Sequence, residues 1–486
     1  MKKYILLSLT AIGAIVSIMS CKHEPGAAPK DAGDGAYPAV VSNIFVNRCA
    51  TAGCHNEASH TGAGGLRLDS WEHLFDGGVN GAVVVPYSSD YSSLMYFINT
   101  DSSLGPVAIP TMPLNHKPLS KEEYLAVKKW IDEGAPDKNG NIAFSSNPAT
   151  RQKIYVVHLG CDMVAVIDAE KNVVMRYVPI GNTEGLEMGA YITSSPDGGN
   201  VYACMWFGEE MYKIDAYTDK VVANIPLNNI LWGTMTVSPD GGKVALTNVD
   251  NHKLAIVNTA TASMEYLPGT SFLNPNGVAA NKTFDTFYVT SLHGNTVYKY
   301  SNGYTKTISI DGKALTTATA GATPDPFEIG MNPDYSRYFV TCHQTKEVRV
   351  FNTQNDSLVK VIPVGIRPTA LTFAKSKPYL FVACSEDVST GIFKGTVYVI
   401  NYNTLEVVKV IAGDFYQPNS VALNEQGNTF YVFSRNQNFN GPAPHHSGPC
   451  SGRNGYYQVY DMNTLEPKSG RRYEILVDPF IAASRF

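Results

Sequence analysis

The chain has 486 residues, 17% of them charged, and a formal net charge of −5. Its 38 Lys and Arg residues do not exceed its 43 Asp and Glu residues, so there is no basic excess to neutralise phosphates, which excludes nucleic acid as an expected partner. An aromatic content of 11% with a modest net charge excludes intrinsic disorder. The length predicts two or three domains of low charge.

The first 20 residues have the pattern of a bacterial secretion signal. Lys2 and Lys3 precede an apolar stretch at residues 5–18, which is too short to span a bilayer as a permanent helix. Small residues then lead to Cys21. The pattern resembles the lipobox of bacterial lipoproteins, which implies cleavage before Cys21, lipidation of its thiol, and anchoring in the cell envelope, expected at the outer membrane. The alternative is an ordinary signal peptide with an incidental cysteine.

The next unit contains the motif CATAGCH, in which Cys49 and Cys54 are followed by His55. Covalent haem attachment needs two thiols and an imidazole next to the second thiol, usually in the spacing C-x-x-C-H. Four residues separate the thiols here, so the loop to Cys49 has to bulge, while the step from Cys54 to His55 is intact. Met112 is the candidate for the second axial ligand of the iron, and methionine in that position suits electron transfer.

Two helices are predicted on either side of this motif. The first leads directly into Cys49 and carries four apolar residues on one side: Val40, Val41, Ile44 and Phe45. The second begins at a capping box of Ser120 and Glu123. Its apolar residues recur at helical spacing and the run stops at Gly134 and Pro136: Tyr124, Val127, Trp130 and Ile131.

Together with GGLRLDSW at residues 64–71 and WIDEGAP at residues 130–136, this order resembles the c-type cytochrome domain of bacterial envelope lipoproteins over about a hundred residues. The resemblance implies a small all-α domain with covalent haem c on Cys49 and Cys54 and iron bound by His55 and Met112. Two alternatives stay open. The two cysteines form a small disulfide and the domain binds no haem, or they bind zinc together with His55 and His60.

Beyond residue 136 the sequence repeats. Seven similar segments recur at spacings of 47, 43, 43, 51, 49 and 60 residues, and they end at Asp168, Asp215, Asn258, Ser301, Asn352, Asn401 and Asp461. Each alternates apolar and polar residues over two short runs. Seven units of this length predict a propeller with seven blades of four strands. The repeats resemble the YVTN family of propellers and, more loosely, surface-layer and lactonase-like propellers. This likeness implies architecture and not function.

The last residues predict how the ring closes. From Pro479 onward the sequence resembles the inner strand that begins other blades, such as IRPTALTF at residues 366–373. We expect it to complete the first blade, whose other three strands come from residues 153–179, because this pairing covers edges that would otherwise lie open. The expected layout is a signal peptide, a flexible tether, a cytochrome c-like domain, a linker and a propeller: residues 1–20, 21–36, 37–136, 137–150 and 151–486.

All six histidines of the propeller fall in the predicted loops between second and third strands. Imidazole and sulfur suit copper or haem iron, so one interpretation is a second metal site on this rim, with these candidates: His158, His293, Cys342, His343, His445 and His446. The other interpretation is that loops collect polar residues. Cys161 and Cys450 lie in loops of adjacent blades after closure and are candidates for a disulfide, whereas Cys204 is expected to pack inside its strand.

Three functional hypotheses follow. The favoured one is a lipid-anchored electron carrier, whose haem domain passes electrons while the propeller docks a redox partner protein or ligand. The first alternative is an oxidoreductase that binds a substrate or second cofactor on the propeller rim. The second is a haem-free surface binding lipoprotein, which depends on a disulfide between Cys49 and Cys54.

Overall fold

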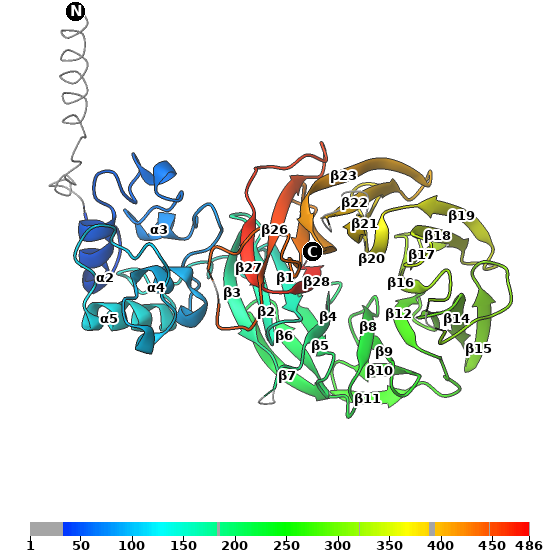
Figure 1. Ribbon diagram of the computed structural model, residues 1–486. Coiled ribbons are helices and arrows are strands. Elements are labelled where there is room, and N and C mark those ends of the chain that lie inside the picture. Colours follow the sequence, from blue (N-terminus) through cyan, green and yellow to red (C-terminus); the bar gives the residue numbers. More distant parts are fainter. Residues whose placement is uncertain (1–32, 182–184, 320, 388–393, 447, 486) are drawn as a thin grey trace, which may run out of the picture.

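The computed structural model describes residues 33–181, 185–319, 321–387, 394–446 and 448–485. The predicted signal peptide, Cys21 and most of the predicted tether lie outside the described residues. A small helical domain lies beside a ring of seven β-sheets (Figure 1). No helix in the described part of the chain is long and apolar enough to cross a membrane.

The helical domain is built from short elements. A six-residue helix α2 (Ala39–Ile44) continues into a π-helical turn η1 (Phe45–Cys49), and the longest helix is α5 (Lys121–Asp132). Between them lie two more α-helices and three 3₁₀ turns: η2 (His60–Gly62), α3 (Trp71–Leu74), η3 (Ser89–Tyr91), α4 (Ser93–Ile98) and η4 (Ser102–Leu104).

Helix α5 begins as the sequence predicts. The Ser120 side chain accepts a hydrogen bond from the backbone N–H of Glu123, and the Glu123 carboxylate accepts one from the backbone of Ser120. The same carboxylate pairs with Arg48 at 2.8 Å, which ties the start of α5 to the π-helical turn η1. This contact holds the two bracketing helices together next to the CATAGCH loop.

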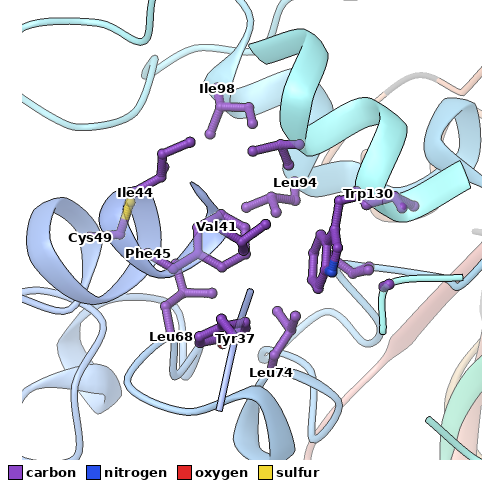
Figure 2. Packing of buried hydrophobic residues seen from close by; sticks show 14 of the residues in the cluster. Tyr37, Val41, Ile44, Phe45, Cys49, Leu68, Leu74, Leu94, Ile98 and Trp130 are labelled. Atoms are coloured by element: carbon purple, nitrogen blue, oxygen red, sulfur yellow. The ribbon is translucent and has the colours of Figure 1, made fainter. Parts of the chain in front are cut away.

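One hydrophobic cluster forms the core of the helical domain. The rings of Tyr37, Phe45 and Trp130 meet edge to face with centroids 5.4 to 6.2 Å apart, and Cys49 lies in the same cluster (Figure 2). Val40, expected on the buried side of the first helix, is instead 56% exposed. The prediction was wrong because the helix is only six residues long and widens into a π-helical turn, which changes the face that meets the core.

The ring has seven four-stranded antiparallel blades, as predicted. Blade 1 contains β28 (Pro479–Ser484), β1 (Lys153–His158), β2 (Met163–Asp168) and β3 (Val173–Pro179). Blade 2 contains β4 (Gly189–Ser194), β5 (Asn200–Met205), β6 (Glu210–Asp215) and β7 (Lys220–Pro226). Blade 3 contains β8 (Trp232–Val237), β9 (Lys243–Asn248), β10 (Lys253–Asn258) and β11 (Ser263–Tyr266). Blade 4 contains β12 (Pro275–Ala280), β13 (Thr286–Ser291), β14 (Thr296–Ser301) and β15 (Tyr304–Ser309).

Three further blades complete the ring. Blade 5 contains β16 (Pro326–Met331), β17 (Arg337–Cys342), β18 (Glu347–Asn352) and β19 (Leu358–Pro363). Blade 6 contains β20 (Ile366–Phe373), β21 (Tyr379–Asp387), β22 (Lys394–Asn401) and β23 (Glu406–Tyr416). Blade 7 contains β24 (Pro418–Asn424), β25 (Thr429–Ser434), β26 (Asn454–Asp461) and β27 (Tyr473–Val477).

The predicted closure is confirmed. Strand β28 is the inner strand of blade 1 and pairs antiparallel with β1, with Ile154 opposite Ser484 and Val157 opposite Ile481. Arg485, directly after β28, is 2% exposed and donates hydrogen bonds to the carbonyls of Gly198 and Arg151. The last strand is therefore held by pairing on one side and by a buried arginine at its end.

Hydrophobic side chains fill the spaces between the blades. Seven clusters of buried residues each combine side chains from two neighbouring blades. The predicted disulfide joins Cys161 to Cys450 across blades 1 and 7. The other three propeller thiols, Cys204, Cys342 and Cys384, form no disulfide in the described part of the chain and are fully buried. The odd number of propeller cysteines is thus one disulfide plus three thiols packed in strands.

The helical domain lies against the side of the ring at blades 1 and 7, next to β3 and β27 (Figure 1). Val85 of the helical domain belongs to the hydrophobic cluster between these two blades. Polar and ring contacts add to this interface: Lys171 with Asp76 at 2.5 Å, the Glu474 N–H with the Asn80 carbonyl at 2.8 Å, Tyr177 with Tyr91 at 5.4 Å between centroids, and Arg176 over the Tyr87 ring at 5.3 Å.

Candidate functional site

A cavity of about 430 Å³ lies between the two domains. The helical domain contributes the predicted motif residues Cys49, Cys54, His55 and Met112 to its wall. Blade 7 closes the opposite side with residues from the loop before β26 and from β27. The structure thus brings the four predicted haem-binding residues to one cavity, although the first, Cys49, and the last, Met112, are 63 positions apart in the sequence.

Backbone carbonyls orient His55, with Leu66 and Ala63 both acting on its ring. Its Nδ1 lies 3.3 Å from the carbonyl oxygen of Leu66, and because a carbonyl can only accept, Nδ1 carries the proton. In the neutral ring this leaves the lone pair on Nε2, the atom that can ligate iron. Burial lowers the pKa of His55, which favours the neutral form of the ring.

The four residues between the cysteines fold into a tight loop. The N–H of His55 donates back to the carbonyl of Cys49 at 3.1 Å, and the N–H of Cys54 donates to the carbonyl of Thr51 at 3.0 Å. Gly53 has a φ of +83°, a left-handed conformation that glycine adopts without strain. The two residues that exceed the usual spacing are accommodated in this bulge, as the sequence predicts.

The thiols of Cys49 and Cys54 are both free, so no disulfide joins them. Burial raises the pKa of the Cys49 thiol to about 12. His60, the fourth residue of the zinc alternative, has its Nδ1 2.9 Å from the carbonyl of Glu57. Within the described ranges, no cluster of three or more metal-ligating side chains forms from these residues. Among the described residues, neither the disulfide nor the zinc cluster of the two alternatives is formed.

Met112 is half-buried and packs against the core cluster of the helical domain. Its backbone N–H donates to the carbonyl of Phe97 at 2.7 Å, which fixes the Met112 segment beside α4. The thioether is a soft ligand that suits haem iron and raises its reduction potential. With His55, it gives the cavity one imidazole and one thioether donor.

The propeller side of the cavity carries His445, His446 and Glu474. The nitrogen or oxygen ligand atoms of these three residues all lie within 4.8 Å of one another. Burial, and next the neighbouring His445, lowers the pKa of His446 to about 4. Burial raises the pKa of Glu474. The sequence singled out both histidines, but it gave no signal for Glu474, which lies in an ordinary alternating strand.

The other four rim candidates lie elsewhere. His158 is fully buried at the end of β1, and burial lowers its pKa to about 4. His293, Cys342 and His343 lie near Asp325, whose Oδ1 accepts from the His293 N–H and whose backbone carbonyl accepts from the His343 N–H. The structure therefore does not gather the six candidates into one site.

A second cavity, of about 260 Å³, lies inside the ring and is lined by residues of the seven inner strands. Two tryptophans and three basic side chains contribute to it: Trp206, Trp232, His343, Arg367 and Arg435. The ring of His343 stacks on Phe327 with centroids 4.1 Å apart, and burial lowers the His343 pKa to about 3. Arg435 is already paired with Asp478.

The fold and the cavity define a two-domain protein that joins a cytochrome c-like domain to a seven-bladed β-propeller. Residues 52–106 match the family described as Planctomycete cytochrome C. This match includes Cys54 and His55, and it begins after Cys49 and ends before Met112. A cytochrome c relationship implies haem c as the cofactor, and the donor set of the cavity fits that group: two thiols outside any disulfide, an imidazole and a thioether.

No protein of curated function matches the chain. Among solved structures, a functionally unknown protein from Desulfotomaculum acetoxidans is similar over 68% of this chain and 100% of its own, with 15% identity and a TM-score of 0.47. At this level of similarity the solved structure carries no argument about function.

Proposed function

We propose that the protein is an electron carrier of the bacterial envelope, with haem c attached through Cys49 and Cys54 and iron ligated by His55 and Met112. The observation that carries this proposal is the meeting of all four side chains at one cavity, with the His55 ring held through Nδ1 by the carbonyl of Leu66. When bound, the haem supplies a one-electron couple, and a methionine ligand suits electron transfer more than oxygen chemistry.

The protein's own residues set the conditions at this cavity. The hydrogen bond from Nδ1 to Leu66 fixes the His55 ring, and Arg48 with Glu123 fixes the helix end that carries Cys49. Much of the remaining wall is apolar and includes Leu66, Leu68 and Ile98. A low-polarity surrounding disfavours extra charge on the bound group, which raises its reduction potential further.

We further propose that the lipid on Cys21 anchors the protein at the outer membrane and that the propeller docks a redox partner protein. The lipobox supports the anchor, and a propeller exposes large loop surfaces on both faces of its ring. Replacing Cys21 by Ser tests the anchor. The variant should appear in the soluble envelope fraction, whereas the Cys204→Ser variant, which changes a buried strand thiol, should stay with membranes.

Haem staining of a denaturing gel tests the central proposal. The full chain, expressed with haem-maturation machinery, should carry one covalent haem, and the double variant Cys49→Ser, Cys54→Ser should carry none. Cys384→Ser is the matched control, because this thiol is buried in strand β21 and should leave the haem stain unchanged. A wild-type chain without covalent haem would refute the proposal.

The reduced and oxidised spectra test the axial ligands. Met112→Leu should remove the absorption band of a sulfur–iron bond and lower the reduction potential, while the haem stays covalently attached. Met95→Leu is the matched control, because Met95 is buried in the same domain core and is not part of the cavity wall. An unchanged spectrum in Met112→Leu would mean that another group binds the iron.

The cavity inside the ring favours a second candidate function, an oxidoreductase that binds its substrate there. Two tryptophans and an exposed arginine, Arg367, give this cavity both apolar surface and positive charge. Small anionic compounds that change the redox state of the haem on mixing would support it. Replacing Arg367 by Met should then slow that change without altering the haem spectrum.

A further inference from the structure

The loop between β25 and β26 reaches from blade 7 to the helical domain. Its described residues, 435–446 and 448–453, are held in place at several points. The Arg453 guanidinium donates to the carbonyls of Asn436, Gly441 and Pro442. The disulfide of Cys450 ties the same loop to blade 1. These contacts therefore fix the position of the described part of the loop.

Two side chains of this loop meet a carboxylate from the neighbouring strand. His445 and His446 approach Glu474 of β27, and the ligand atoms of all three lie within 4.8 Å of one another. Nδ1 of His446 is buried and, among the described residues, has no hydrogen-bond partner. It lies 3.8 Å from Oε2 of Glu474, which is too far for a hydrogen bond. A buried polar atom without a partner is costly, so the arrangement calls for a further group.

The separation of these atoms fits a metal ion. Ligand atoms about 2.0–2.1 Å from a tetrahedral metal lie about 3.3 Å from each other, so a shift of about half an ångström would bring Nδ1 and Oε2 to that separation. Two imidazoles and one carboxylate are a common set of three protein ligands, and the set leaves one coordination position for water or a small molecule.

The surroundings orient the three ligands. The Glu474 carboxylate accepts hydrogen bonds from the Asn454 side chain at 3.1 Å and from the His445 backbone N–H at 3.0 Å. From the helical domain, the rings of Tyr96 and Phe97 lie 5.2 and 5.0 Å from the rings of His446 and His445. Such supporting contacts fix ligand direction and are typical of metal sites.

We propose that His445, His446 and Glu474 bind a divalent transition-metal ion of the zinc and copper class. The site lies in the wall of the cavity that contains Cys49, Cys54, His55 and Met112, so the bound ion faces the region that we assign to haem. The proposal goes beyond electron transfer by the haem domain and does not require it, because all three ligands belong to the propeller.

Metal titration of the full chain tests the proposal. After treatment with a chelator and dialysis, the protein is titrated with Zn²⁺ in a calorimeter. The wild type should bind one Zn²⁺ per chain at micromolar concentration or below. His446→Ala and the conservative variant Glu474→Gln should each weaken binding at least tenfold. His116→Ala is the matched control, because His116 lines the same cavity outside the cluster and its loss should not change Zn²⁺ binding.

A second probe counts the imidazoles. Cu²⁺ added to the chelator-treated chain should give an electron paramagnetic resonance spectrum with splitting from two nitrogens, and His445→Ala should reduce it to one. Melting curves of each variant show whether the propeller is still folded. Equal Zn²⁺ binding by wild type and Glu474→Gln, or a loss of binding in His116→Ala as large as in His446→Ala, would overturn the proposal.

The outcomes also separate this inference from the proposed function. Haem is counted by staining in the same preparations. Metal binding by a chain that carries no haem supports the metal site and refutes the electron carrier. A chain with one haem that binds neither Zn²⁺ nor Cu²⁺ supports the carrier and refutes the metal site. The metal content of the protein as isolated then distinguishes zinc from copper.

Discussion

The two domains are stabilised in different ways. In the described part of the propeller, seven large hydrophobic clusters and one small cluster at Cys161 are each shared by two neighbouring blades. The helical domain has one cluster and only one helix longer than six residues, α5. In the ring, each blade depends on its two neighbours, whereas in the helical domain almost every buried side chain depends on the same core.

This difference predicts where each domain is most sensitive to substitution. A repeated architecture distributes stability over similar interfaces, but it is sensitive at the point where the ring closes. A single-core domain is sensitive at its central side chains. Next to that core lies the cavity of about 430 Å³, whose wall includes Cys49, a member of the same core cluster. The four predictions below test this comparison.

Removal of the closing strand should have the largest effect. A chain that ends after Asp478 lacks β28, which leaves β1 with an open edge and removes the buried Arg485. We expect a loss of more than about 5 kcal/mol, comparable with the whole stability of a domain, so the propeller should be unfolded at 37 °C. Circular dichroism and limited proteolysis measure this. If the truncated chain had the same melting temperature as the full chain, the closing strand would not be a stabilising feature.

Replacing a core tryptophan in one domain at a time should show whether the two domains unfold independently. Trp130→Ala should destabilise the helical domain by about 3–5 kcal/mol, because Trp130 is 5% exposed in its only core cluster. Trp232→Ala, which empties a similar volume between blades 2 and 3, is the matched change in the propeller. Calorimetric melting should show a lowered melting temperature of the helical domain in Trp130→Ala and of the propeller in Trp232→Ala. A single shared transition in both would mean that the domains unfold together.

Loss of the disulfide should have a smaller effect. The double variant Cys161→Ser, Cys450→Ser should lower the free energy of unfolding by about 2–4 kcal/mol, since the bond constrains a separation of 289 residues in the unfolded chain. Denaturant unfolding measures the change. Reductant should shift the wild type by a similar amount and leave the double variant unchanged. A shift of the double variant by reductant would point to a different pairing.

The stability of the propeller should depend on pH through the buried carboxyl group of Glu328. Burial raises the pKa of Glu328 to about 8, so the folded chain holds a proton that the unfolded chain releases above its ordinary pKa of 4.5. Stability should therefore fall as the pH rises from 5 to 8. Glu328→Gln cannot ionise, and it should reduce this fall by roughly 1–3 kcal/mol. Denaturant midpoints at both pH values measure it, with the exposed Glu265→Gln as control.

Repetition made most of the propeller predictable. The seven repeats and their regular spacing predicted the blades, and the similarity of the last segment to other inner strands predicted the pairing of β28 with β1. That pairing in turn placed Cys161 and Cys450 in adjacent blades, where the disulfide forms. In the helical domain, local signals predicted the capping box of Ser120 and the bulge between the cysteines.

The contacts between the domains could not be predicted. His446 and Glu474 are 28 residues apart within blade 7, and their neighbour Tyr96 is more than 300 residues away. Such pairs have no periodicity that a sequence pattern can show. Helix α4 was also missed, because no side chain caps its first turn and the helix has only six residues. The candidate site was therefore half predictable: the haem-domain wall follows from a motif, and the propeller wall follows from docking.

The pairing of β28 with β1 also matters while the protein is being made. Blade 1 contains strands from both ends of the propeller, so it stays incomplete until residue 484 has left the ribosome. During that time the inner edge of β1 is open to any other extended chain. A product that stops early keeps this edge exposed, which makes it a target for aggregation and for proteases. Ring closure thus distinguishes a finished chain from an unfinished one.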